Sequence, residues 1–386
     1  MAESTGDFDR IVDRRAVPGE KWSRFEGRDV IPMWVADMDF AAPEVVIDAI
    51  RARLDHGVLG YTDAWPSLDG AIVDAMDRDY GWRVEPRWLV WLPGMVSAFN
   101  VACRAIGDDG DGVFTATPIY PPFLGAPANN RRQLQQAALR QRADQRWTWD
   151  WDATEAAMDD STRLFMLCNP HNPVGRVFER HELERIAGIC ERRDLVICSD
   201  EIHCGLVLDE GRRHLPIAAI DESIAARTIT LMAPSKTWNI PSLYCAFAII
   251  PDDGLRRLFR RAMRGIVPHA NLLGLIATEA AYRHGEEWRR RLVAYLRANR
   301  SLVGESLADL PEIRTTLPEA TYLAWLDCRP FAQVHGITDL AAHFEAHGVG
   351  LSDGRSFGAP GFMRLNFGCP RPLLEQGLTR IRDALR

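Results

Sequence analysis

Lysine is scarce in this chain, and one of its two lysines has neighbours suited to a chemical role. The 386 residues include 46 lysines and arginines, of which only Lys21 and Lys236 are lysine. Lys236 stands in Pro-Ser-Lys-Thr-Trp-Asn, shortly after the apolar run of residues 228–232. A lysine amine can lose its proton and form an imine with an aldehyde, whereas the guanidinium of arginine stays charged. A coding bias explains the scarcity by itself, so the prediction rests on the neighbours of Lys236, and Lys21, which has none of this kind, is expected on the surface.

Two further polar motifs follow apolar runs in the same way. Asn172 stands in Asn-Pro-His-Asn-Pro-Val-Gly after the run 163–168, and Asp200 stands in Ser-Asp-Glu-Ile-His at the end of the run 195–199. Asn172 and Asp200 are 28 residues apart, and Asp200 and Lys236 are 36 apart, each about one strand–helix–strand unit. Ligands of open α/β sheets bind beyond the carboxyl ends of the strands, so the three side chains are predicted to converge on one pocket.

These three residue types fit the chemistry of pyridoxal 5′-phosphate (PLP). Lys236 would form the imine with its aldehyde, and Asp200 would pair with the pyridine nitrogen and keep the ring electron-poor. Asn172 would donate to the ring hydroxyl oxygen. Simpler roles stay open for two of them, because an aspartate can cap a helix and an asparagine can serve a turn.

A phosphate site is expected at the turn of residues 93–97, between the apolar run 88–92 and a predicted helix at 95–106. The backbone N–H groups of Met95 and Val96 and the helix dipole would hold the dianion there. The chain has no cluster of metal-ligand residues in its sequence pattern, and we expect no metal site.

From residue 88 onward, short apolar runs alternate with amphipathic stretches. Runs that are apolar almost throughout are typical of strands buried on both faces. Strands are expected at residues 88–92, 112–116, 163–168, 195–199, 228–232 and 246–250. Helices lie between several of them, for example at 181–193. The pattern predicts an α/β fold with a mostly parallel sheet.

The pattern changes after Pro268. Long helical stretches are expected over 272–307, then strands at 320–327 and 362–367, and a final helix at 372–386. We predict three parts: an N-terminal segment (1–45) that packs with the small domain, a large PLP-binding α/β domain (46–285), and a small C-terminal α+β domain (286–386).

Composition argues against several classes of function. The net charge of −7 gives no electrostatic basis for binding nucleic acid or anionic membranes. No apolar run is long enough to span a bilayer, and the N-terminus lacks the apolar stretch of a signal peptide. The eight cysteines are scattered and several lie inside apolar runs, which is typical of a reducing compartment, so we expect a cytoplasmic protein.

Taken together, the motifs resemble the fold-type I PLP enzymes, aminotransferase class I/II, and within them the MalY/PatB group of cystathionine β-lyase-like C–S lyases. The likeness spans most of the chain, and its motifs occur in family order. They are residues 31–40, 60–61, 93–97, 117–120, 169–175, 199–203, 234–239 and 363–368. The resemblance implies an amino-acid substrate and a homodimer whose active sites lie at the subunit interface.

The resemblance implies further contacts with the cofactor. Tyr120 would stack on its ring, and His203 would lie near the ring hydroxyl, where aminotransferases usually carry a tyrosine. Tyr61 would reach the phosphate of the neighbouring subunit. Packing roles stay open for all three side chains, because buried aromatic residues and histidines are common in cores.

The resemblance also implies how the substrate is bound. Arg364, in Met-Arg-Leu-Asn-Phe, would clamp the α-carboxylate with its planar fork. Trp34 and Ala36 would border the substrate, although Trp34 could equally be a packing residue.

The chain departs from the family pattern at two positions. Many fold-type I enzymes have a serine three residues before the lysine and an arginine eight residues after it, both on the phosphate. Here those positions hold Ala233 and Tyr244. Phosphate binding must then depend on the helix N-terminus, Ser235 and Tyr61, and the bulky Tyr244 points to a reshaped pocket and an unusual substrate.

The reaction implied by the resemblance is β-elimination on cystathionine or another S-substituted cysteine, which gives a thiol, pyruvate and ammonia. Lys236 would take the Cα proton once its own pKa is lowered by burial. An aminotransferase needs the same residues and is the nearest alternative. A decarboxylating or oxidative PLP enzyme of specialised metabolism acting on an S-cysteinyl compound, and a PLP-binding regulatory or scaffold protein, are the others.

Overall fold

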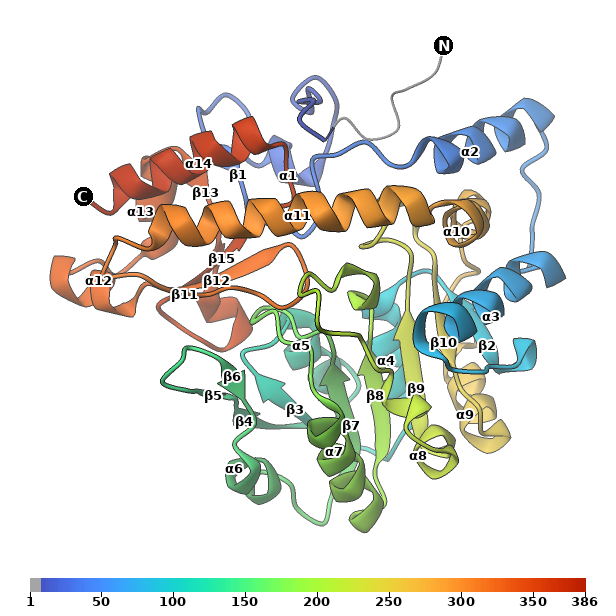
Figure 1. Cartoon of the computed structure of the whole chain (residues 1–386). Coiled ribbons are helices and arrows are strands. Elements are labelled where there is room, and N and C mark those ends of the chain that lie inside the picture. Colours follow the sequence, from blue (N-terminus) through green and yellow to red (C-terminus); the bar gives the residue numbers. More distant parts are fainter. Residues whose placement is uncertain (1–7) are drawn as a thin grey trace.

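The centre of the protein is a seven-stranded sheet with the order β2-β10-β9-β8-β7-β3-β4 (Figure 1). The computed structural model describes residues 8–386, so the first seven residues of the predicted N-terminal segment lie outside the described part. β10 is antiparallel to both of its neighbours, and the pairs from β9 to β4 are parallel, which confirms the mostly parallel α/β sheet. The strands are β2 (Leu89–Leu92), β3 (Gly112–Thr117), β4 (Gln133–Ala138), β7 (Thr162–Cys168), β8 (Val196–Asp200), β9 (Thr228–Met232) and β10 (Ala246–Ile249).

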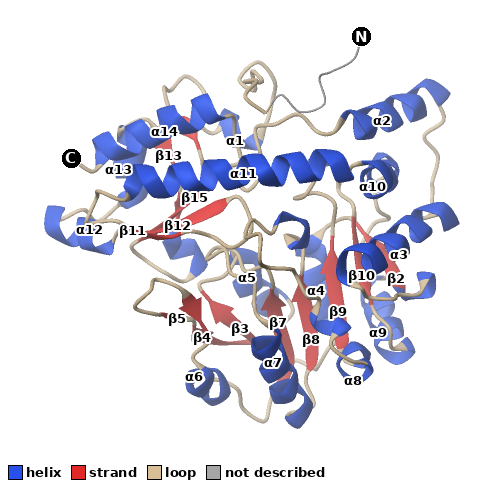
Figure 2. Cartoon of the chain, in the orientation of Figure 1, coloured by secondary structure: helices blue, strands red, loops and turns tan. Residues whose placement is uncertain are grey.

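Helices cover both faces of this sheet (Figure 2). Alternate residues of the central strands pack into separate core clusters on the two faces. In β7, Leu164 and Met166 join one core cluster, and Phe165 and Leu167 join the other, as the two-residue period of a strand requires. One face is covered by α4 (Met95–Ala105), α5 (Pro121–Asn129) and α9 (Asp253–Met263), and the other by α6 (Trp151–Ala156), α7 (Arg180–Arg192) and α8 (Glu222–Ala226).

The edge strand β4 was not among the predicted strands. Its sequence, Gln-Leu-Gln-Gln-Ala-Ala, is largely exposed and polar, so it lacks the apolar run that marked the six others. An edge strand with polar side chains is also less prone to pair with other chains, which explains why this strand can differ from the buried ones.

A second sheet, antiparallel and four-stranded, forms from the C-terminal part of the chain in the order β11-β12-β15-β14. Its strands are β11 (Arg314–Thr316), β12 (Leu323–Asp327), β14 (Ser352–Asp353) and β15 (Phe362–Asn366). Its apolar side chains share a core cluster with α11 (Glu286–Leu307), α12 (Arg329–His335), α13 (Leu340–Ala346) and α14 (Arg371–Ala384).

The helical region expected over 272–307 divides at Gly285 into α10 (Leu272–His284) and α11. The indole of Trp238 donates to the Gly285 carbonyl at 3.1 Å. A Cβ atom at Gly285 would lie 2.5 Å from the indole nitrogen, so only glycine leaves room for this approach. Trp238 lies two residues after Lys236, and the helix break therefore supports the segment that carries the lysine.

The N-terminal segment joins the second sheet region. Its strand β1 (Ile31–Pro32) is paired in parallel with β13 (Val349–Gly350), and its single-turn helix α1 (Glu20–Ser23) precedes β1. The next helices, α2 (Glu44–His56) and α3 (Pro66–Tyr80), both lie against α10. A short hairpin, β5 (Arg140–Gln141) with β6 (Trp147–Thr148), follows β4. The division into segments 1–45, 46–285 and 286–386 remains our proposal.

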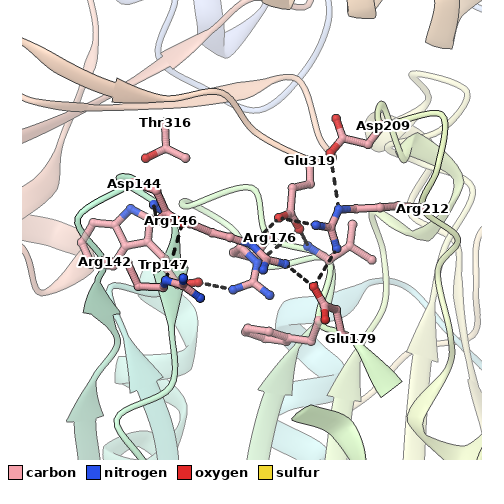
Figure 3. Close-up of polar contacts among 12 residues, drawn as sticks. Arg142, Asp144, Arg146, Trp147, Arg176, Glu179, Asp209, Arg212, Thr316 and Glu319 are labelled. Atoms are coloured by element: carbon pink, nitrogen blue, oxygen red, sulfur yellow. Dashed lines mark hydrogen bonds and ion pairs between the residues drawn. The ribbon is translucent and has the colours of Figure 1, made fainter. Parts of the chain in front are cut away.

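A network of ion pairs joins the C-terminal region to the central sheet region, with Glu319 at its centre (Figure 3). Glu319 lies between β11 and β12 and accepts from Arg146 at 2.9 Å, from Arg176 at 3.2 Å and from the backbone of Val177 at 2.8 Å. We call this set, with its outer members, the Glu319 network: Arg146, Arg176, Glu179, Glu182, Arg212 and Glu319.

The eight cysteines are all buried, and none of them forms a disulfide. Burial raises the pKa of every one of these thiols above its ordinary value. Among the helices of residues 8–386, none is both long and apolar enough to cross a membrane.

Candidate active site

The three predicted strand-end residues lie on neighbouring strands. Asp200 is the last residue of β8, Asn172 lies four residues beyond β7, and Lys236 four residues beyond β9. Because β7, β8 and β9 are adjacent and parallel, their carboxyl ends meet at one edge of the sheet. The structure brings the three together there, with Arg364 of β15 from the second sheet.

Lys236 is partly buried, and its Nζ atom donates to the carbonyl oxygen of Ala36 at 2.5 Å. Burial, followed by the nearby charge of Arg364, lowers the pKa of Lys236 to about 8. An amine with this pKa is about one-tenth deprotonated at pH 7, a far larger fraction than a solvent-exposed lysine or an arginine would reach.

Asp200 is a carboxylate held almost entirely out of water, with 4% of its surface exposed. Burial raises its pKa to about 7, against the opposing bond from the Ile202 N–H at 3.1 Å. Within the described chain it forms no ion pair with an arginine, lysine or histidine. A buried carboxylate without a cation fits the protonated nitrogen of a pyridine ring, which would supply the missing charge.

Arg364 is a guanidinium buried without a carboxylate partner among residues 8–386. It donates to Oδ1 of Asn172 at 3.0 Å and to the carbonyl of Trp34 at 3.0 Å, while its Nε atom has no hydrogen-bond partner. Burial lowers the pKa of Arg364 to about 10, so the cation is held at a cost in free energy. A substrate carboxylate would relieve that cost.

The remaining ring contacts have suitable surroundings. The Nδ1 atom of His203 is buried without a partner, and burial lowers the pKa of this imidazole well below its ordinary value. Tyr120 caps the start of α5, and its phenol lies close enough to Arg364 and Asp200 to sense both charges. An aromatic cofactor between these groups would meet Tyr120, His203 and Asp200 at once.

The start of α4 is free to bind a phosphate. Gly94 precedes the helix and provides no side-chain cap, so the first N–H groups, including those of Met95 and Val96, have no partner within the helix. Ser235 is partly buried beside Lys236, and Ala233 is buried. These observations fit PLP: uncapped N–H groups for its phosphate, Asp200 for its nitrogen and Lys236 for its aldehyde.

Two tyrosines stand apart from this group. Tyr61 is fully exposed, with a relative accessibility of 107%, and the structure does not bring it to the site of its own chain. Tyr244 is 65% exposed, and its backbone has a φ of 47°, in the left-handed region that a bulky residue seldom adopts.

Sequence reasoning missed Tyr322. Its buried hydroxyl donates to the Ala36 carbonyl at 2.8 Å, so this one oxygen accepts from both Tyr322 and Lys236. The sequence placed Tyr322 in a strand region with other apolar residues, and no motif around it indicated a polar role. Trp34 and Ala36, which the resemblance implied, do lie here through their backbone carbonyls.

The prediction that Lys21 is a surface residue was wrong. Lys21 is 1% exposed, and its Nζ atom lies 2.6 Å from Oδ2 of Asp39 and 3.0 Å from the carbonyl of Asp37. It stands in Gly-Glu-Lys-Trp-Ser-Arg, where no apolar run marked it as buried. The burial depends on the carbonyl of Asp37 and the carboxylate of Asp39, which lie 16 and 18 residues further along the chain.

Comparisons with known proteins agree with this geometry. The family model of aminotransferase class I and II matches residues 28–381. The cystathionine beta-lyase PatB of Bacillus subtilis (strain 168) is 36% identical over 391 residues, which cover 98% of this chain and 100% of PatB. Among solved structures, a protein named OvoB is 43% identical with a TM-score of 0.95, and it covers 98% of this chain and 99% of its own. The PLP-bound C-S lyase from Staphylococcus hominis is 33% identical with a TM-score of 0.92, covering 98% of this chain and 99% of its own.

Proposed function

We propose, from the premise that this chain belongs to the aminotransferase class I and II family, that it is a PLP-dependent carbon–sulfur β-lyase. Its substrate is an S-substituted cysteine, with cystathionine as the first candidate. The Cβ–S bond breaks and a thiol leaves, and the three-carbon remainder takes up water to give pyruvate and ammonia.

The chain's own residues divide this work. Bound PLP supplies an aldehyde for the substrate amine and an electron-poor ring that accepts the electron pair of Cα. Arg364 binds the substrate α-carboxylate, which orients Cα toward Lys236. Lys236, with its pKa lowered to about 8, takes the Cα proton and holds it as an ammonium against the Ala36 carbonyl. Asp200 stabilises the protonated ring nitrogen.

One observation carries the proposal. Arg364, a buried cation without a counter-ion in the described chain, lies close enough to influence Lys236, an amine with a lowered pKa. This pairing suits an α-amino acid whose carboxylate is bound while its Cα proton is removed. The relatives named for cystathionine β-lyase and C–S lyase then favour elimination over transamination.

The proposal includes a homodimer in the cytoplasm. An exposed apolar stretch, residues 58–61, follows α2, and Tyr61 at its end is fully exposed. A second copy of the chain would cover this surface and receive Tyr61 at its phosphate. The buried, unpaired cysteines support a reducing compartment.

The test is product analysis with a panel of S-substituted cysteines. We expect pyruvate and free thiol in equal amounts without any added keto acid. Lys236→Ala is expected to lose both this activity and the visible absorbance of the bound cofactor. Turnover that requires a keto-acid acceptor and releases no thiol would instead identify an aminotransferase and refute the lyase.

A further inference from the structure

Residues 34–40 form an irregular segment with bends at residues 35–36 and 39–40, here called the carbonyl strap. Its backbone oxygens are bound by side chains from distant parts of the chain. Two of these oxygens meet the predicted catalytic groups: Trp34 O accepts from Arg364 at 3.0 Å, and Ala36 O accepts from Lys236 at 2.5 Å. The other donors to the strap carbonyls are Ser352, Tyr322, Asn366, Asn239, Lys21 and Arg14. The position of the strap therefore sets where both groups rest.

Lys21 binds the strap through its side chain and its backbone carbonyl. Its Nζ atom donates to Asp37 O at 3.0 Å, one residue from the carbonyl that Lys236 uses, and to Oδ2 of Asp39 at 2.6 Å. Its own carbonyl accepts from the indole of Trp34 at 3.1 Å. Lys21 thus contacts the strap near its start, at Trp34, and near its end, at Asp39.

The charges at this contact are balanced inside the protein. Asp39 is 4% exposed and also accepts from the indole of Trp22 at 2.9 Å and from Arg14 at 2.7 Å. Burial would raise the pKa of Asp39, but the charge and hydrogen bond of Lys21, the hydrogen bond from Trp22 and the charge of Arg14 together outweigh it, and the pKa is lowered. Without Lys21, Asp39 would keep its ion pair with Arg14 but lose the charged partner that is buried with it.

We propose that Lys21 is a positioning residue for the active site, which holds the strap so that the Ala36 and Trp34 carbonyls meet Lys236 and Arg364. This inference rests on the proposed function, because it assigns Lys21 to the same site. It also gives a reason for a lysine in a chain with 44 arginines. A compact ammonium fits between Asp39 and the Asp37 carbonyl in a space closed to solvent, whereas a planar guanidinium is larger and needs a wider set of acceptors.

The kinetic test compares three variants. Lys21→Met keeps the length of the side chain and removes its charge, and we expect kcat to fall about 10- to 100-fold as the strap shifts. The double variant Lys21→Met/Asp39→Asn removes both charges, so its thermal midpoint should recover toward wild type while kcat stays low. Arg28→Met is the matched control, since Arg28 follows α1 and pairs with Glu345 at the surface, 3.2 Å away and far from the strap's carbonyls. Its kcat and KM should be unchanged.

Two kinetic outcomes would overturn the proposal. One is a wild-type kcat in Lys21→Met. The other is a double variant that regains kcat together with its thermal midpoint, because Lys21 would then only balance a buried charge.

A second readout needs no activity. In the cofactor-free protein, the amides of Met38 and Asp39 donate to Asn239 and to Gly368 O, both at 2.9 Å. Hydrogen exchange at these amides should be faster in Lys21→Met and unchanged in Arg28→Met. Unchanged exchange in Lys21→Met would refute the positioning role. If the wild-type protein releases no thiol from any substrate, the proposed function fails, while the exchange result still decides the role of Lys21.

Discussion

A single carboxylate, Asp200, links the stability of the folded chain to the chemistry of its site. Its pKa of about 7 means that the charged form is disfavoured by burial until a cation lies beside it. The unfolded chain would hold this group at its ordinary pKa of about 3.9. The folded state without cofactor therefore binds a proton that the unfolded state has released, between these two pKa values, and wild-type stability falls as the pH rises through that range.

We predict that Asp200→Asn stabilises the cofactor-free protein while it weakens catalysis. The variant removes a buried charge, so its free energy of unfolding at pH 8 should exceed that of wild type by on the order of 4 kcal/mol. The difference should disappear near pH 3, where the wild-type carboxyl is protonated in both the folded and the unfolded state. Urea denaturation across this pH range measures the effect, and a variant less stable than wild type at pH 8 would contradict it.

Arg364→Lys should raise KM and lower kcat/KM by about 10- to 100-fold, because an ammonium cannot form the bidentate contact with a carboxylate. The shorter reach also removes one of the bonds to Asn172 and to the Trp34 carbonyl. Initial rates over a substrate series test this, with Arg260→Lys as a control on the far helix α9, where the guanidinium only meets the Leu89 carbonyl. Equal kcat/KM in wild type and Arg364→Lys would show that Arg364 does not bind the substrate carboxylate.

At the level of elements, the turn that carries Asn172 depends on the segment before β12. The Ala320 N–H donates to the Gly175 carbonyl at 3.0 Å, and a Cβ atom at Gly175 would lie 2.2 Å from Pro318. The Glu319 network fixes this segment from the other side (Figure 3). Contacts between segments far apart in sequence thus keep the amide of Asn172 beside Arg364.

Glu319→Gln should therefore lower the free energy of unfolding by about 3 kcal/mol, because buried and partly buried arginines lose their shared counter-charge. Chemical denaturation measures this. Glu210→Gln is the control, since Glu210 pairs with Arg297 but is 80% exposed, and its loss should cost less than about 1 kcal/mol. A similar loss of unfolding free energy in the two variants would show that burial of the Glu319 network does not add to stability.

The elements that sequence could predict are those with a local signal. Six buried strands were marked by apolar runs, and the spacing of Asn172, Asp200 and Lys236 followed from one strand–helix–strand unit per step. Tyr322 and Lys21 could not be predicted in their roles, because their partners are backbone carbonyls and carboxylates brought near only by the folded chain. The Glu319 network could not be predicted for the same reason. No sequence motif distinguishes its three arginines from the other arginines of the chain, which has 44 in all.

At the scale of the whole molecule, the proposed dimer decides whether each site is complete. The apolar side chains of Val58, Leu59 and Tyr61 are all more than half exposed in the single chain. Exposed apolar residues in a contiguous stretch are typical of an interface. The tyrosine would then complete the phosphate site at the start of α4 of the other copy.

Mixing two inactive variants tests this arrangement. Lys236→Ala and Tyr61→Ala should each be impaired, but a mixed dimer contains one site with an intact lysine and an intact partner tyrosine. When the two are unfolded and refolded together in equal amounts, about a quarter of the wild-type activity should return, since half of the dimers are mixed and each has one complete site. Recovery no greater than the sum of the separate variants would show that Tyr61 does not act across the interface.

The eight buried thiols bear on a hazard that the proposed reaction creates. A lyase that releases a thiol at every turnover works in the presence of a nucleophile able to attack disulfides and to form mixed disulfides with accessible cysteines. Here every cysteine is out of solvent, and burial keeps its pKa raised, so little thiolate is available for exchange. The buried cysteines are therefore protected from forming mixed disulfides with the thiol that the reaction releases, even where that thiol accumulates.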